Sequence, residues 1–258
     1  MTSGARGAVV CDLDGVIWLG DQPIAGAAEA VARLRAAGRR VLFVSNNSFA
    51  PVGDVEAKLA RFAIPAAGDV ITSAAAAATL VQPGERVLLC GGPGAVEALT
   101  ARGVTIVDDG DADAVMVGFH RSFDYEGLRR AATAVRRGAR LIGTNDDATY
   151  PTPDGPIPGG GAILAAVVTG SGTTAVVAGK PYPPMAALVR TVLGGLDGAV
   201  MVGDRPDTDG RFAVALGVPF ALVLSGVTAA DDLPVEPTPS MVAVDLAALA
   251  DQLLSAQA

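Results

Sequence analysis

The sequence predicts an α/β fold in which a doubly wound parallel sheet forms the core and a second α/β unit is inserted into it. Two observations predict this fold. Short apolar runs alternate with stretches of helical periodicity at both ends of the chain, a pattern typical of parallel sheets whose strands are buried on both faces. A second alternating set lies between the two ends, and 258 residues with 50% hydrophobic content suffice for a core and a smaller domain.

The two ends of the chain supply the predicted core. Apolar runs bounded by polar residues predict strands, and apolar residues spaced three or four apart predict helices. The N-terminal elements are strand Ala8–Asp12, helix Ala27–Arg39, strand Val41–Ser45 and helix Val52–Phe62. The C-terminal elements are strand Ala175–Gly179, helix Pro184–Leu193, strand Ala199–Gly203, helix Thr208–Leu216 and strand Pro219–Leu224. We therefore assign residues 1–76 and 175–258 to the core.

The middle of the chain, residues 77–174, is the predicted insert. Its strands are Val87–Cys90, Val104–Val107, Ala114–Val117 and Leu141–Gly143, and its helices are Ala95–Arg102, Tyr125–Arg137 and Gly161–Thr169. The Pro/Gly-rich stretch Tyr150–Gly161 lies between a predicted strand and a predicted helix. We therefore interpret it as an ordered turn of the insert rather than as a linker.

The composition excludes several classes of function. Lys and Arg total 19 against 27 Asp and Glu, which gives a formal net charge of −8. Because phosphate contacts need a basic surface, we predict no nucleic-acid partner. No apolar run approaches the ~20 residues that cross a bilayer, so we predict no membrane partner. The N-terminus lacks the pattern of a signal peptide, and a cytoplasmic protein is expected. Cys11 and Cys90 lie in apolar runs, where buried free thiols are expected.

Acidic residues follow two of the predicted core strands. Asp12 and Asp14 emerge from the first strand, and Asp204 directly follows Ala199–Gly203. Ligands bind at the carboxyl ends of the strands in open parallel sheets, so we expect these carboxylates to share one crevice. Neighbouring carboxylates repel each other and need a compensating cation. Mg²⁺ suits a site with few carboxylates, several waters and a substrate phosphate oxygen, so the sequence predicts Mg²⁺ as the cofactor.

Two further strand ends carry groups that can bind phosphate. Ser45, Asn46 and Asn47 end or follow the strand that begins at Val41. A hydroxyl group, amide groups and backbone N–H groups at such a position can cradle phosphate oxygens. Lys180 follows the strand Ala175–Gly179, from which its ammonium group can neutralise phosphate. The predicted partner is a small phosphorylated metabolite.

These pieces, in their order and spacing, resemble the haloacid dehalogenase superfamily. Within it they resemble the NagD-like branch of p-nitrophenyl-phosphatase-like and phosphoglycolate-phosphatase-like enzymes, over almost the whole chain. The matching core motifs are Asp12–Val16, Ser45–Asn47, Gly179–Pro181 and Gly203–Asp209. The matching motifs of the insert are Gly118–Arg121 with Tyr125, Thr144–Asp147 and Pro158–Gly161. The resemblance implies a Rossmann-like core, an α/β cap domain formed by the insert, and a homodimer through the cap.

The resemblance also implies a Mg²⁺-dependent phosphatase that hydrolyses small-molecule phosphate monoesters through an aspartyl-phosphate intermediate. Asp12 would be the nucleophile and a metal ligand. Asp14 would be the general acid for the leaving group and then the base for water, with its backbone carbonyl on the metal. Asp204 would bind Mg²⁺, and Asp209 would support the site from outside the ligand sphere. The residues that would hold the phosphate are Gly15, Ser45, Asn46, Asn47 and Lys180.

The sequence departs from the pattern of this branch at three positions. Pro206 and Gly210 stand where the branch has larger apolar residues, which can alter the loop beside Asp204. His120, the single histidine, stands where Asp is common, and its role stays open.

Two alternatives on the same fold also stay open, namely a catalytically idle phosphate-binding or regulatory protein and a phosphomutase. A Ser-His-Asp hydrolase is excluded because no G-x-S-x-G motif is present, and a P-loop nucleotidase because Pro181 follows Lys180.

Overall fold

The computed structural model describes residues 6–150 and 155–255. The strands are β1 (Arg6–Cys11), β2 (Trp18–Leu19), β3 (Gln22–Pro23), β4 (Arg39–Ser45), β5 (Val70–Thr72), β6 (Arg86–Cys90), β7 (Thr105–Val107), β8 (Ala114–Val117), β9 (Arg140–Gly143), β10 (Thr149–Tyr150), β11 (Ile157–Pro158), β12 (Val176–Val177), β13 (Val200–Gly203), β14 (Phe220–Val223) and β15 (Met241–Ala243). The helices are α1 (Ala27–Ala36), α2 (Val52–Arg61), α3 (Ser73–Ala78), α4 (Pro93–Arg102), α5 (Tyr125–Arg136), α6 (Gly160–Ser171), α7 (Pro183–Leu193), α8 (Arg211–Leu216) and α9 (Leu246–Ser255).

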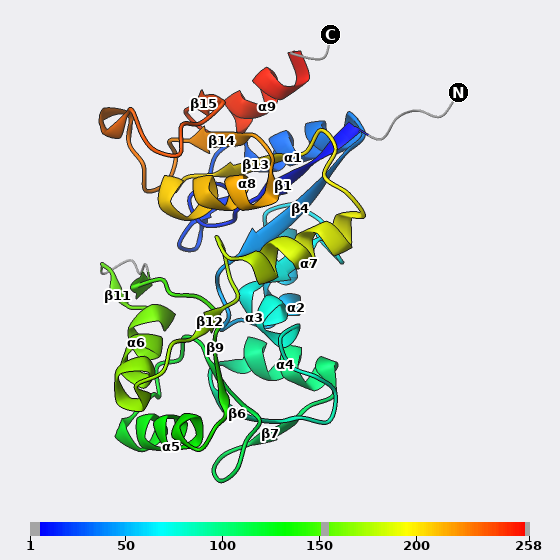
Figure 1. The fold of residues 1–258 in the computed structure, drawn as a ribbon. Coiled ribbons are helices and arrows are strands. Elements are labelled where there is room, and N and C mark those ends of the chain that lie inside the picture. Colours follow the sequence, from blue (N-terminus) through cyan, green and yellow to red (C-terminus); the bar gives the residue numbers. More distant parts are fainter. Residues whose placement is uncertain (1–5, 151–154, 256–258) are drawn as a thin grey trace. The chain divides into compact units, whose positions relative to one another are not determined.

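The described residues form two units. Figure 1 labels their strands and helices. The first unit lies within Met1–Ser45, Val55–Ile71 and Val189–Ala258, and the second within Asn46–Asp54 and Thr72–Leu188. The boundaries between the units fall directly after β4 and inside α2, β5 and α7. The predicted insert, residues 77–174, lies within the second unit, which also takes in Asn46 and Lys180. The predicted limits of the insert itself stay a prediction.

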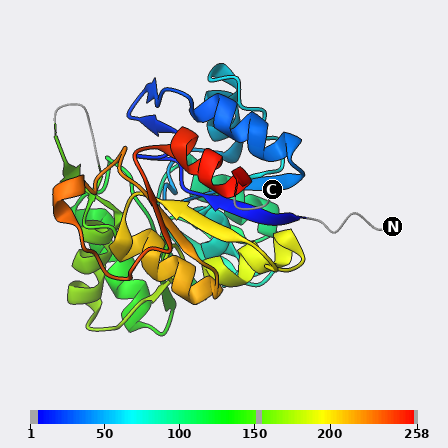
Figure 2. The ribbon, with the colours of Figure 1, turned by 90° about the horizontal axis from the view of Figure 1, so that it is seen from above.

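The first unit is built on a sheet with the strand order β15-β14-β13-β1-β4-β5 among the described residues. Strand β1 lies between β13 and β4 and is parallel to both, so that Cys11 pairs with Val202 on one side and with Phe43 on the other. Figure 2 shows α1 and α9 on one face of this sheet and α8 on the other. The predicted doubly wound parallel sheet is therefore confirmed. The carboxyl ends of β1, β4 and β13 meet at one edge of the sheet.

The second unit has its own sheet with the order β12-β9-β8-β6-β7, and the pairs along it are parallel. Helices α5 and α6 lie on one side of it and α4 on the other (Figure 1). Strand β12 pairs with β9 here, whereas the sequence analysis placed Ala175–Gly179 in the core. An apolar run identifies a strand but carries no information about which sheet it joins.

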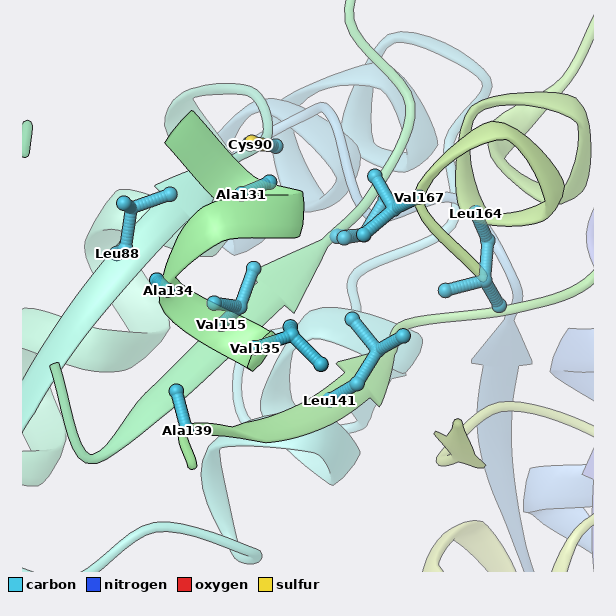
Figure 3. Packing of buried hydrophobic residues seen from close by; sticks show 11 residues of the cluster. Leu88, Cys90, Val115, Ala131, Ala134, Val135, Ala139, Leu141, Leu164 and Val167 are labelled. Carbon is cyan, nitrogen blue, oxygen red and sulfur yellow. The ribbon is translucent and has the colours of Figure 1, made fainter. Parts of the chain in front are cut away.

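The core of the second unit is a cluster of small and branched side chains. Leu164 and Val167 of α6 face the strands of the sheet and the helix α5, as Figure 3 shows. Cys90 belongs to this cluster, and burial raises the pKa of its thiol to about 11. Cys11 in β1 is also buried, so the prediction of buried free thiols is confirmed for both cysteines.

The Pro/Gly-rich stretch Tyr150–Gly161 lies partly outside the described residues, because these leave out 151–154. Its described ends form an antiparallel pair, in which Tyr150 lies opposite Ile157. Gly160 then begins α6. The flanks of the predicted ordered turn thus have regular structure. Across residues 6–150 and 155–255, no helix is both long enough and apolar enough to cross a bilayer.

Candidate active site

The carboxylates of Asp12 and Asp204 lie together at the carboxyl edge of the first unit's sheet. Asp12 follows β1 and Asp204 follows β13, and these strands are neighbours. The backbone N–H of Asp12 donates to the carbonyl oxygen of Val202 at 2.9 Å, which extends the parallel ladder by one residue. Both side chains are buried, with 9% of Asp12 and 2% of Asp204 exposed. The sheet therefore brings together two of the carboxylates that the sequence analysis expected in one crevice.

Asp209 is a third member of this group. One oxygen from each of Asp12, Asp204 and Asp209 lies within 4.8 Å of the others, and all three side chains are buried. A π-helical turn, Pro206–Gly210, follows β13 and brings Asp209 back to the carboxyl end of that strand. The backbone N–H of Arg205 donates to Asp209 Oδ2 at 3.1 Å, which fixes that carboxylate. We call these three residues the acidic cluster.

Gly203, the last residue of β13, leaves the space that Asp209 uses. A Cβ atom at position 203 would lie closer than 3.0 Å to the Asp209 carboxylate. A glycine is therefore required at position 203, because the carboxylate of Asp209 in the same motif approaches so closely. Thr208 and Gly210 beside Asp209 are also buried, so the second half of the turn is packed.

Gly15 makes a similar close approach to Asp204. Its φ of +80° lies in the left-handed region that favours glycine. A Cβ atom there would also lie closer than 3.0 Å to Asp204 Oδ2. The motif Asp12–Val16 therefore contacts the carboxylate of Asp204 through Gly15, a residue that has no side chain. This contact is the structural role of Gly15, which the sequence analysis placed among the phosphate-binding residues.

A loop after β14, Ser225–Thr228, ties the two motifs together, and the sequence analysis did not identify it. The Ser225 hydroxyl donates to the carbonyl of Gly15 at 2.7 Å. The Val227 N–H donates to Asp204 Oδ2 at 2.6 Å, and the Thr228 hydroxyl donates to the Asp204 carbonyl at 2.6 Å. The only sequence signal for this loop is a Ser-Gly pair after a buried strand, which is typical of many turns.

Asp14 is not a member of the acidic cluster, and its side chain is exposed. The indole Nε1–H of Trp18 donates to Asp14 Oδ1 at 2.9 Å. The Trp18 ring is itself held against Phe62, with ring centroids 6.1 Å apart, and beneath the Lys58 ammonium at 4.3 Å. A buried ring thus orients an exposed carboxylate two residues beyond Asp12.

The predicted phosphate-binding residues after β4 differ in what they contact. Ser45, the last residue of β4, is buried at the same edge of the sheet as the acidic cluster. Asn47 Oδ1 accepts from the N–H groups of Phe49 at 2.9 Å and Ala50 at 3.4 Å, so it stabilises the turn before α2. Such a turn is a common role for an Asn at a loop.

Asn46 and Lys180 lie together in the second unit. Asn46 Oδ1 accepts from the Lys180 N–H at 2.7 Å, and Asn46 Nδ2 donates to the Lys180 carbonyl at 3.0 Å. Asn46 Nδ2 also donates to Asp147 Oδ2 at 3.1 Å. The side chain of Lys180 is buried, with 2% exposed. The structure thus joins two residues that the sequence analysis selected from distant motifs.

The acidic cluster suits a divalent metal ion. Three buried carboxylates this close together repel one another, and burial removes the water that would screen them. A cation with oxygen ligands removes that repulsion, and carboxylate oxygens are the donors that Mg²⁺ and Ca²⁺ prefer. The chemistry of the donor set and its burial therefore fit the metal that the sequence predicts, and the cluster can bind a divalent cation.

His120 is half-buried in the second unit. Its Nδ1 lies 3.2 Å from the Ser122 hydroxyl, and its ring meets that of Phe123 edge to face. Burial lowers the pKa of His120, and the nearby carboxylate of Asp124 opposes this shift. In the described part of the chain, His120 Nε2 has no hydrogen-bond partner. These contacts are structural, and they assign His120 no chemical role.

Two family models match the chain. The model of haloacid dehalogenase-like hydrolases matches residues 9–105, which contain Asp12, Asp14 and Ser45. A second model of the same class, HAD-hydrolase-like, matches residues 177–249, which contain Lys180 and Asp204. Together they cover both ends of the chain and contain the four core motifs of the sequence analysis.

Individual proteins are similar over nearly the full chain. The D-glycerol 3-phosphate phosphatase of Mycobacterium tuberculosis is 38% identical over 253 residues, which are 93% of this chain and 70% of that protein. The p-nitrophenyl phosphatase from Archaeoglobus fulgidus has a similar structure, with a TM-score of 0.91, 31% identity and coverage of 96% and 99% of the two chains.

A structure of the glycerol phosphate phosphatase of Mycobacterium tuberculosis in complex with magnesium is also similar. Its TM-score is 0.88 and its identity 36%, over 95% of this chain and 76% of that one. All of these names describe phosphatases. The expected resemblance is thus confirmed over the whole architecture, and the chain belongs to the haloacid dehalogenase-like hydrolases, within their NagD-like branch of phosphatases.

Proposed function

We propose that this protein is a Mg²⁺-dependent phosphatase that hydrolyses small phosphate monoesters through an aspartyl-phosphate on Asp12. The observation that carries the proposal is the acidic cluster, in which Asp12, Asp204 and Asp209 converge within 4.8 Å at the carboxyl edge of the sheet. A relative of known structure binds magnesium, and the related proteins are named as phosphatases. In this proposal Asp204 and Asp12 hold the metal with the backbone carbonyl of Asp14.

Asp209 has a larger part in this proposal than the outer support that the resemblance implies. Its carboxylate lies in the same group of oxygens as those of Asp12 and Asp204. It is fully buried and fixed by the Arg205 N–H. We therefore include it among the residues on which metal affinity depends.

The reaction divides into two steps. The Asp12 carboxylate attacks phosphorus and forms an Asp–O–P bond as the ester P–O bond breaks, and Asp14 donates a proton to the leaving oxygen. Asp14 then removes a proton from water, which attacks phosphorus and releases Asp12 and inorganic phosphate. Bound Mg²⁺ supplies neutralisation of the charge on the phosphoryl group. Lys180 contributes a second positive charge, and Ser45 a hydroxyl donor.

Asp14 is suited to proton transfer by its position. The indole of Trp18 orients the carboxylate through Oδ1 at 2.9 Å, and the side chain is exposed, so a leaving group or water can approach it. Asp12 is buried and therefore shielded from water, which favours attack by a positioned carboxylate.

The substrate in this proposal is a small phosphorylated metabolite. The related enzymes are named for D-glycerol 3-phosphate and for p-nitrophenyl phosphate, so the names alone support a class of esters rather than one compound. The net charge of −8 disfavours nucleic acid as a partner. Dimerisation through the cap and a cytoplasmic location stay predictions.

The proposal is tested by phosphate release from p-nitrophenyl phosphate and a panel of metabolite monoesters, with Mg²⁺ and with excess chelator. Turnover should require the metal. Asp12→Asn should lower kcat by roughly 10⁴-fold, because a nucleophile acts only in the transition state. Asp231→Asn is the matched control, because Asp231 is an exposed residue of the first unit and its substitution should leave kcat unchanged.

The same measurements separate the alternatives. Turnover no higher than that of Asp12→Asn over the whole panel would favour an idle phosphate-binding or regulatory protein, whereas turnover that persists in excess chelator would contradict the metal dependence. In Asp14→Asn, the mass of one phosphoryl group should accumulate on Asp12, because no base activates water. A wild-type phospho-enzyme that transfers its phosphoryl group to a sugar phosphate faster than to water would instead indicate a phosphomutase.

A further inference from the structure

The side-chain amide of Asn46 has no hydrogen left for a phosphate oxygen. A carboxamide nitrogen carries two hydrogens. In Asn46 these are directed at the Lys180 carbonyl, 3.0 Å away, and at Asp147 Oδ2, 3.1 Å away. The amide cannot be reversed, because the Lys180 N–H that meets Oδ1 at 2.7 Å can only donate, and the Lys180 carbonyl can only accept. Phosphate oxygens require donors, and both donors of this side chain are in use.

The main chain of Asn46 is held as firmly as its side chain. Its carbonyl oxygen accepts from the Ser73 hydroxyl at 2.6 Å and from Asn145 Nδ2 at 2.8 Å. These two donors come from the start of α3 and from the loop after β9, and both belong to the second unit. Residue 46 is therefore held by hydrogen bonds to Lys180, Asp147, Ser73 and Asn145. None of these bonds uses its backbone N–H.

Glycines make room for these bonds. A Cβ atom at Gly179, the residue before Lys180, would lie 2.6 Å from Asn46 Oδ1 and 2.7 Å from the Thr144 carbonyl. A Cβ atom at Gly160 would lie 3.0 Å from Asn145 Oδ1, and one at Gly159 closer than 3.0 Å to the backbone of the 147–149 loop. The glycine before the lysine thus lets Asn46 reach both polar groups of the Lys180 backbone.

We propose that Asn46 is a positioning residue that holds the backbone of Lys180 by both its N–H and its carbonyl, with Asp147 holding the amide of Asn46, and that its side chain does not bind phosphate. The inference rests on the proposed function for the role of Lys180. A lysine ammonium sits on a flexible four-carbon stem, so its reach is set by where its backbone is held. Any contact of residue 46 with phosphate then uses the backbone N–H.

The hydrogen bond to Lys180 can be tested without any activity. The chain has two lysines, Lys58 and Lys180, so protein labelled with ¹⁵N only in lysine gives two backbone amide signals. Lys58 lies in α2 and serves as the internal control. Asn46→Leu should accelerate hydrogen exchange of the Lys180 amide by about tenfold or more and leave that of Lys58 unchanged.

Asp147 offers a conservative pair of variants. Asp147→Asn keeps an oxygen that accepts from Asn46 Nδ2 and should keep Lys180 exchange near the wild-type rate. Asp147→Leu removes that oxygen and should accelerate it. If Asn46→Leu does not fold, as a change at Lys58 would reveal, Asn46→Ser replaces it. An unchanged Lys180 rate in a folded Asn46 variant would overturn the proposal.

A double-mutant cycle tests the functional consequence. We expect Asn46→Leu to lower kcat/KM for p-nitrophenyl phosphate by roughly 10–100-fold in the wild type, but by less than about threefold in Lys180→Met, because residues that act through one another are not additive. The dissociation constant of inorganic phosphate, measured by calorimetry, should follow the same pattern. Independent losses that multiply would show that Asn46 binds phosphate directly. Absence of turnover in the wild type would count against the proposed function alone, since the amide exchange still decides whether Asn46 holds Lys180.

Discussion

Gly226 lies against the carboxylate of Asp204 so closely that a Cβ atom at position 226 would stand less than 3.0 Å from Asp204 Oδ2. The next residue, Val227, donates its N–H to the same oxygen at 2.6 Å. One oxygen of this carboxylate is thus held by the backbone of the loop after β14, and the orientation of the whole group depends on a residue without a side chain.

We predict that Gly226→Ala weakens metal binding. The added methyl group displaces Asp204, and loss of the groups that orient a metal ligand typically lowers affinity by about 10–100-fold. Calorimetric titration with Mg²⁺ measures this directly. Gly53→Ala is the matched control, because a Cβ atom at position 53 meets nothing within 4 Å. Equal affinities in the two variants would contradict the role of the loop.

Trp18→Phe should slow turnover without unfolding the protein. The variant loses the Nε1–H that meets Asp14 but retains an aromatic ring to pack against Phe62. We expect kcat to fall by about tenfold, because a hydrogen bond to a charged group is lost. In an Asp14→Ala background the same substitution should change kcat by less than about twofold. A full loss in that background would mean that Trp18 acts through another group.

The single histidine should make stability depend on pH. Burial lowers the pKa of His120 below 6.5, its ordinary value and the one expected in the unfolded chain. The unfolded state therefore binds a proton more readily, so this contribution to stability is complete above pH 6.5 and is lost as pH falls towards the folded pKa. Melting temperatures at pH 5 to 8 should fall less steeply on acidification in His120→Gln than in the wild type. Parallel curves would show that His120 has the same pKa in both states.

Leu164→Ala should destabilise the second unit. Leu164 lies in the cluster of Figure 3 with 5% exposed, and its side chain fills the space above Gly143. Truncation of such a leucine costs about 2–5 kcal/mol, which urea denaturation can measure. Val96→Ala on α4, where 43% of the side chain is exposed, is the control and should change stability by about 0.5 kcal/mol or less.

Much of the fold follows from local patterns in the sequence. Buried apolar runs such as Val200–Gly203 identify strands, because a parallel sheet buries both faces of each strand. The acids that follow β1 and β13 point to a shared site, and the structure brings Asp12 and Asp204 together. Their chemical roles stay predictions, as do those of the other proposed site residues.

Other features depend on contacts that no local pattern encodes. The run at Val176–Val177 reads as a strand whichever sheet it joins, and in the structure it joins β9. Asp209 enters the acidic cluster because a π-helical turn at Pro206–Gly210 replaces the helix start that periodicity predicts. The bonds of Asn46 to Lys180 join distant segments, and an Asn in a loop looks the same with or without them.

The place of β1 between β4 and β13 has a consequence for biosynthesis. During translation Asp12 and β4 emerge before β13 and Asp209, because the intervening residues must be made first. Until Asp204 and Asp209 have been made, the nascent polypeptide therefore avoids the mutual repulsion of the three carboxylates of the acidic cluster. A ribosome stalled ahead of β13 would display a chain that contains only Asp12 of the acidic cluster, so the proposed metal site would be incomplete.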